Sequence, residues 1–152
     1  MKHLLMVYHS KDGSTGRMAA AVSRGARHED LETEFRELTA FEAGLDDLLW
    51  ADGLILGTPE NFGYMSGAMK DFLDRVFYPA EGKVEGLPYA IFVKAGNDGT
   101  GALTSIRRIC NGFPFKEVQE PLIVAGDLTD EHLARCEEFG LYMAAGLDSS
   151  VF

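Results

Sequence analysis

Residues 54–75 read LILGTPENFGYMSGAMKDFLDR, and this stretch decides the fold. A short apolar run, Leu54–Leu56, leads into a turn rich in Gly, Pro and Asn, and a helical pattern follows at once. Apolar side chains recur at helical spacing from Met65 to Phe77, while charged side chains take the opposite face. The stretch therefore predicts a buried strand, a loop and a helix in direct succession, which is the unit of a parallel sheet.

The same alternation continues on both sides of this stretch. Three further apolar runs are bounded by turn residues, and because they are continuous they predict strands covered on both faces: Leu4–Tyr8, Tyr89–Val93 and Leu122–Ala125. The mixed segment Leu31–Leu38 reads as an edge strand, because half of its side chains are charged. Helical patterns separate all these runs, so strand and helix alternate five times. We expect an α/β fold: a three-layer sandwich with a five-stranded parallel sheet of order 2-1-3-4-5 and helices on both faces.

Length and charge limit the class of protein. A chain of 152 residues fits one domain, 1–152, with one core. The net charge of −10 argues against binding to nucleic acid or to anionic membranes and permits docking to basic partners. No apolar run approaches the ~20 residues of a membrane helix, and the first residues lead into a strand, so a cytoplasmic location is expected. Cys110 and Cys136 lie on different predicted helices and read as buried free thiols.

The loop after the first strand has the composition of a phosphate cradle. Residues 9–16 read HSKDGSTG and open a helix near Arg17. Backbone N–H groups and small hydroxyls at a helix N-terminus donate to an anion, and the helix dipole favours it. The loop is neither GxxxxGK[ST] nor GxGxxG, which disfavours nucleoside triphosphates and classical dinucleotide binding. Two readings stay open: a plain turn with Ser14 or Thr15 as the helix cap, and a cradle to which Lys11 and Arg17 add charge.

Two more loops are expected at the same edge of the sheet. Thr58–Gly63 follows the third strand, and the glycine-dense Ala95–Gly101 follows the fourth. Glycines let the backbone approach a planar ligand, while Phe62 or Tyr64 can cover an apolar face. Because the carboxyl ends of parallel strands share one edge, the three loops predict a site for a flat, phosphorylated ligand.

Residues 57–75 resemble the second flavin-binding loop and the following helix of the flavodoxin-like FMN proteins. The likeness is greatest to the tryptophan-repressor-binding-protein-like NAD(P)H:quinone oxidoreductases and the NADPH-dependent FMN reductase group. The first loop, from Tyr8 to Gly13 and on to Ala19, resembles the phosphate loop of that family at the same distance from the N-terminus. The resemblance implies a flavodoxin-like sandwich that forms a single FMN-binding domain.

The resemblance also implies which residues touch FMN. The phosphate would be held by Ser10, Gly13, Ser14 and Thr15. The isoalloxazine would be bordered by the second loop, namely Thr58, Pro59, Glu60, Asn61, Phe62 and Gly63. Its pyrimidine edge or dimethylbenzene side would face Ala95, Gly96, Asn97 and Gly99. No catalytic acid or base and no metal ligand is expected, because the flavin performs the redox chemistry.

Two redox functions follow. The first is an FMN-dependent NAD(P)H oxidoreductase that reduces a quinone, a free flavin or another small acceptor. The second is a flavodoxin-type carrier that passes electrons between protein partners. It is favoured by the acidic surface and by the short link Ala125–Thr129, where the quinone reductases carry a long insertion. A homodimer and a flavin-binding regulator without turnover also stay open.

Overall fold

The computed structural model describes residues 1–10 and 13–152. The predicted alternation of strands and helices is confirmed. The elements are, in chain order, β1 (His3–Tyr8), α1 (Ser14–Ala26), β2 (Glu34–Thr39), α2 (Leu45–Trp50), β3 (Gly53–Asn61), β4 (Tyr64–Met65), α3 (Gly67–Ala80), β5 (Pro88–Ala95), α4 (Thr100–Cys110), β6 (Lys116–Glu117), β7 (Leu122–Ala125) and α5 (Asp130–Asp148). Thr129 is the N-cap of α5, and its side chain accepts a hydrogen bond from the His132 amide.

The sheet has the predicted order. Strands β2, β1, β3 and β5 lie side by side in parallel, and β6 and β7 both pair with β5. Met6 stands opposite Ile55, which in turn stands opposite Ala90, so apolar residues meet across the middle of the sheet. β2 is the predicted edge strand, and β1 is its neighbour.

The number of strands differs from the prediction: the described part of the chain forms seven strands in place of five. The fifth strand is split, because the chain leaves β5 after Glu117 and returns at Leu122. Pro121 stands just before the return and has no N–H to donate to the ladder. β3 also runs to Asn61, through residues that the sequence suggested were loop, because β4 pairs with its end.

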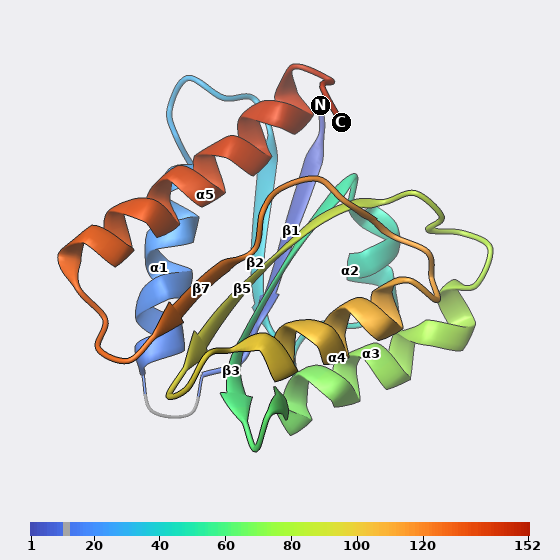
Figure 1. Cartoon of the computed structure of the whole chain (residues 1–152). Coiled ribbons are helices and arrows are strands. Elements are labelled where there is room, and N and C mark those ends of the chain that lie inside the picture. Colours follow the sequence, from blue (N-terminus) through green and yellow to red (C-terminus); the bar gives the residue numbers. More distant parts are fainter. Residues whose placement is uncertain (11–12) are drawn as a thin grey trace.

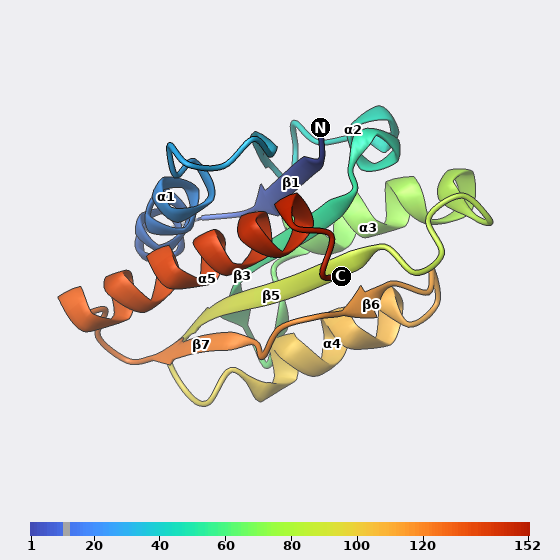
Figure 2. The ribbon, with the colours of Figure 1, turned by 90° about the horizontal axis from the view of Figure 1, so that it is seen from above.

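Helices cover both faces of the sheet (Figure 1). α1 and α5 lie on one side, and α2, α3 and α4 lie on the other (Figure 2). The two helix layers bury separate apolar clusters, one around Met18 and Phe92 and one around Phe72 and Ile91. The backbones of α1 and α5 are in contact at Gly140 of α5. A Cβ at this position would collide with the Val22 carbonyl of α1, so only glycine permits the close approach.

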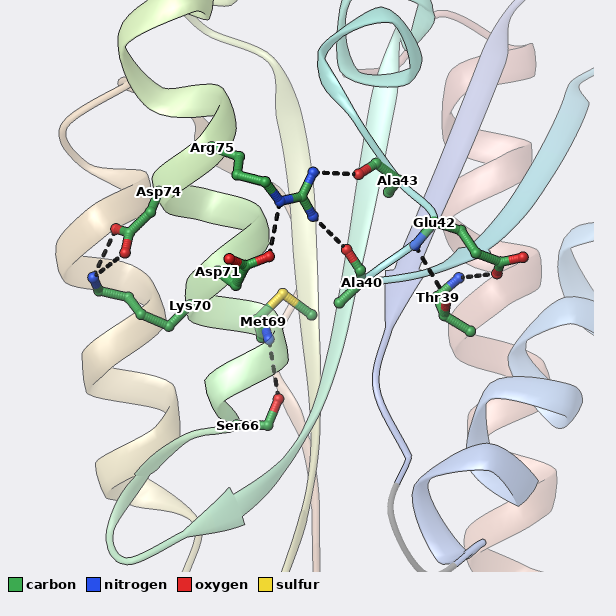
Figure 3. Close-up of polar contacts among 10 residues, drawn as sticks. All are labelled: Thr39, Ala40, Glu42, Ala43, Ser66, Met69, Lys70, Asp71, Asp74 and Arg75. Atoms are coloured by element: carbon green, nitrogen blue, oxygen red, sulfur yellow. Dashed lines mark hydrogen bonds and ion pairs between the residues drawn. The ribbon is translucent and has the colours of Figure 1, made fainter.

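One arginine of α3 fixes the loop that follows β2. The Arg75 guanidinium donates to the Ala40 carbonyl at 2.7 Å and to the Ala43 carbonyl at 2.9 Å, while its Nε donates to Asp71 (Figure 3). The carboxyl ends of β1, β3, β5 and β7 all point to one edge of the sheet, and the chain termini lie at the other (Figure 1). Within residues 1–10 and 13–152, no helix combines the length and the apolarity that crossing a membrane requires.

Candidate functional site

The three predicted loops meet at the carboxyl edge of the sheet. The His9 amide donates to the Gly57 carbonyl at 3.1 Å, which ties the first loop to β3. Pro59 stands opposite Lys94 in the ladder, so the second loop and the loop after β5 start side by side. Lys11, a candidate for added charge, lies outside the described residues together with Asp12.

In the first loop, two backbone N–H groups donate to the side chain of Ser10. The Ser10 hydroxyl oxygen accepts from the amides of Gly13 at 3.2 Å and Gly16 at 3.0 Å. Gly13 is the N-cap of α1, with φ of 99° and no side-chain cap. The N-cap position is therefore taken by neither Ser14 nor Thr15, and the start of α1 lies at the edge of the sheet, where a helix N-terminus favours an anion.

Thr15 is the residue that marks this loop as a binding site. It is 1% exposed, and within the described part of the chain its hydroxyl has no hydrogen-bond partner. Leaving a buried hydroxyl unpaired costs about 1–3 kcal/mol. A phosphate at the start of α1 would supply the missing acceptor, and the helix dipole would favour its charge. The residues present thus fit the phosphate of FMN.

The second loop is a tight hairpin. Asn61 of β3 pairs with Tyr64 of β4, so Phe62 and Gly63 form a two-residue turn. Their φ values are 53° and 70°, which is the type I′ pattern of hairpin turns. Glycine adopts such angles freely, whereas a bulky aromatic residue there is strained by roughly 1–3 kcal/mol. The Phe62 side chain is nevertheless fully exposed, so the hairpin holds an aromatic ring in solvent at the edge of the site.

Hydrogen bonds of buried hydroxyl groups fix the position of this hairpin. The Thr58 hydroxyl donates to the Pro59 carbonyl at 2.8 Å and accepts from the Ser66 amide at 3.0 Å. Ser66 in turn caps α3 by accepting from the Met69 amide (Figure 3). The Met65 amide donates to the Ser105 hydroxyl of α4 at 3.1 Å. The hairpin is therefore fixed to α3 and α4.

The second loop also touches the start of α4 directly. The Glu60 carboxylate accepts from the Ala102 amide at 3.0 Å, near the N-terminus of the helix, where a negative charge is favourable. A Cβ on Gly101 would collide with the Gly63 carbonyl. Glu60 thus has a structural partner as well as its predicted place beside the ligand. Gly101 ends the predicted loop Ala95–Gly101 but was not among the residues expected to touch the ligand, and Ser105 of α4 was not predicted at all, because only the folded chain brings the two to the hairpin.

The loop after β5 supplies the third wall. Ala95 and Gly99 are buried at its two ends, and Gly96 and Asn97 are exposed between them. The Asp98 carboxylate accepts from the Thr100 amide at 3.0 Å and the Thr100 hydroxyl at 2.8 Å, and these bonds lower the pKa of Asp98. The start of α4 is therefore bonded partly by Asp98 of its own loop and partly by Glu60, while Gly96 and Asn97 stay exposed.

Lys94 is a site candidate that was missed from the sequence. Its Nζ lies 3.4 Å from the Ala95 carbonyl at the end of β5. Within the described residues no carboxylate lies within 4 Å of this partly buried cation. The signal was present in the sequence, since Lys94 is the one charged residue in the strand PYAIFVKA.

Comparison with known proteins gives the family of this fold and site. Residues 36–127 match the family model of the NADPH-dependent FMN reductases. A relative from Aquifex aeolicus (strain VF5), named flavodoxin, is 39% identical over 119 residues, which cover 76% of this chain and 63% of the relative. A protein from Acidithiobacillus ferrooxidans (strain ATCC 53993 / BNL-5-31), named NAD(P)H dehydrogenase (quinone), is 32% identical over 126 residues, with 70% and 63% covered. The chain thus spans somewhat less than two thirds of these curated relatives.

A solved flavodoxin from the domain Archaea superposes with a TM-score of 0.81 at 21% identity, over 95% of this chain and 98% of that one. The flavodoxin-like sandwich predicted from the sequence is thereby confirmed as the fold.

Proposed function

The chain belongs to the NADPH-dependent FMN reductase family, and on that premise we propose that it binds FMN at the carboxyl edge of its sheet and accepts electrons from NADPH or NADH. The observation that supports this most directly is the buried hydroxyl of Thr15 in the first turn of α1, which has no hydrogen-bond partner within residues 1–10 and 13–152. We propose further that residues 1–152 act as one FMN-binding domain.

The proposal gives each loop a task. Amides and hydroxyls of Ser10, Gly13, Ser14 and Thr15 hold the phosphate, because Gly13 is the N-cap of α1, Ser14 and Thr15 begin the helix, and Ser10 is bonded to the Gly13 and Gly16 amides. Pro59–Gly63 borders the ring system, with the Phe62 ring exposed for contact with it. Ala95, Gly96, Asn97 and Gly99 present backbone groups to its polar edge. FMN, when bound, supplies the ability to take up a hydride and pass electrons on.

We propose a small oxidised molecule, such as a quinone or a free flavin, as the electron acceptor. The name of a relative supports this choice of acceptor, since the Acidithiobacillus ferrooxidans protein is named NAD(P)H dehydrogenase (quinone). Asn61 is partly exposed and Asn97 is exposed, so both side chains could contact such a molecule. Phe62, which is fully exposed, would also suit contact with a second copy of the chain in a homodimer.

The decisive experiment measures two quantities on purified protein. FMN binding is followed by the quenching of FMN fluorescence, and reduction of the bound FMN by NADPH and NADH is followed by stopped-flow absorbance. We expect stoichiometric binding and reduction much faster than that of free FMN. A chain that takes up no FMN would overturn the whole proposal, whereas bound FMN that reacts no faster than free FMN would remove the enzymatic part.

The second candidate function is an electron carrier between proteins. It is supported by the relative named flavodoxin and by the net charge of −10, since an acidic surface favours docking to basic partners. The short link from β7 to α5 suits this function as well. A stepwise reductive titration separates the two: two distinct one-electron steps favour the carrier, and a single two-electron step favours the reductase.

A further inference from the structure

A groove runs along α3 and α4, away from the hairpin. It consists of two cavities of about 420 and 320 Å³ that share Arg108 and Ile109, and we call it the α3/α4 groove. Its first part begins at Gly63 and Thr100, beside the proposed flavin ring, and its second part ends at Tyr78. The groove therefore joins the carboxyl edge of the sheet to the far ends of the two helices.

The cations in and beside this groove differ in whether a carboxylate pairs with them. Lys70 is paired with Asp74 at 2.7 Å (Figure 3), and the neighbouring Arg107 holds Glu117 with two bonds of 2.8 Å. Arg108 is exposed and, among the residues that the structure describes, has no carboxylate within 4 Å. A guanidinium without a counter-charge, at the junction of two cavities of a strongly acidic protein, is suited to an anionic ligand.

The shape and the aromatic side chains of the groove narrow the choice of ligand. Tyr64 and Tyr78 both line it and are 42% and 78% exposed, so each offers an open ring surface to a flat base. Thr100 and Arg108 are eight residues apart on α4, which corresponds to about 12 Å at ~1.5 Å per residue. An elongated molecule could place one end at the hairpin and a phosphate at Arg108.

We propose that the α3/α4 groove binds a nicotinamide dinucleotide, with the nicotinamide at the hairpin and a phosphate of the adenosine end on Arg108. The inference rests on the proposed function, because it places the electron donor of that reaction. The guanidinium suits a phosphate, since its N–H groups can donate two parallel bonds to two phosphate oxygens. Arg108 acts as a binding residue that sets the affinity for the donor.

Calorimetric titration of the FMN-loaded protein with NADP⁺ and with NAD⁺ tests the inference without turnover. We expect Arg108→Gln to weaken binding about tenfold or more, as loss of a charged hydrogen bond does, and Arg108→Lys to keep part of the affinity. Arg135→Gln is the matched control, because Arg135 is an exposed arginine on α5, in the opposite helix layer. Unchanged FMN content in all three variants would show that the fold is intact.

The titrations also identify the phosphate. A loss confined to NADP⁺ assigns Arg108 to the 2′-phosphate, and an equal loss for both dinucleotides assigns it to the pyrophosphate. The inference is overturned if Arg108→Gln binds both as the parent does, if Arg135→Gln loses as much, or if the parent binds neither. Failure of the proposed function is seen separately, in a parent protein that binds NADP⁺ while NADPH does not reduce its FMN.

Discussion

Thr15 carries the prediction that is clearest at the scale of single residues. Thr15→Val removes a buried hydroxyl that has no partner in the described structure, so we expect the unfolding free energy of the FMN-free protein to rise by about 1 kcal/mol. The same change should weaken FMN binding about tenfold, because the phosphate loses a donor. Urea unfolding and FMN fluorescence titration measure the two effects.

Ser10→Ala is the contrasting variant. The Ser10 oxygen accepts two amide bonds, so its loss should lower the stability of the FMN-free protein by about 1 kcal/mol. Opposite signs for the two variants in the FMN-free protein are the expected pattern. Unchanged FMN affinity in Thr15→Val would show that its hydroxyl does not serve the phosphate.

Phe62 is a second residue at which stability and ligand binding favour different amino acids. Phe62→Asn places a residue that tolerates positive φ in the type I′ turn, so we expect the unfolding free energy to rise by about 1 kcal/mol. FMN affinity should fall several-fold, because an aromatic surface beside the ring is lost. Val151→Asn is the control: Val151 is 72% exposed and has no positive φ, so its replacement should change stability by less than about 0.5 kcal/mol.

At the scale of elements, the contact between the hairpin and α4 decides the shape of the site. A Cβ on Gly101 would collide with the Gly63 carbonyl, so Gly101→Ala should cost about 2 kcal/mol or more and weaken FMN binding. Gly67→Ala in the first turn of α3 meets nothing within 4 Å and should be neutral or stabilising by up to about 1 kcal/mol. Thermal unfolding of both variants with and without FMN checks this. Equal stability of the two would contradict the contact.

The elements themselves were largely predictable from local patterns. Leu122–Ala125 agrees with β7 residue for residue, and Leu4–Tyr8 differs from β1 by one residue. β3 was expected to end at Leu56 because Gly57 and Pro59 are usual turn residues. Pairing with β4 keeps the chain extended to Asn61, and such pairing depends on residues beyond the strand. The short β6 was missed for the same reason, since two residues carry no periodic pattern.

At the scale of the whole molecule, burial of the two thiols links stability to alkaline pH. Burial raises the pKa of Cys136 from 9.0 to about 11 and also raises the pKa of Cys110. Above pH 9 the unfolded chain loses these protons before the folded chain does, so the unfolding free energy should fall as pH rises from 9 to 11. Urea unfolding at several pH values measures the slope. Cys136→Ala should reduce the slope, and a slope that stays the same would contradict the assignment to this thiol.

The amino-acid sequence by itself determined the class of fold, the strand order and the three loops that meet at the carboxyl edge, because periodicity, turn residues and the handedness of crossovers are properties of neighbouring residues. Only the tertiary structure decided that, among the described residues, the Thr15 hydroxyl has no hydrogen-bond partner and Arg108 has no carboxylate within 4 Å, and that Gly101 touches the hairpin. Each of these facts depends on which groups far apart in the sequence lie within a few ångströms of one another in the folded chain, and the spacing of residues along the sequence does not determine those distances.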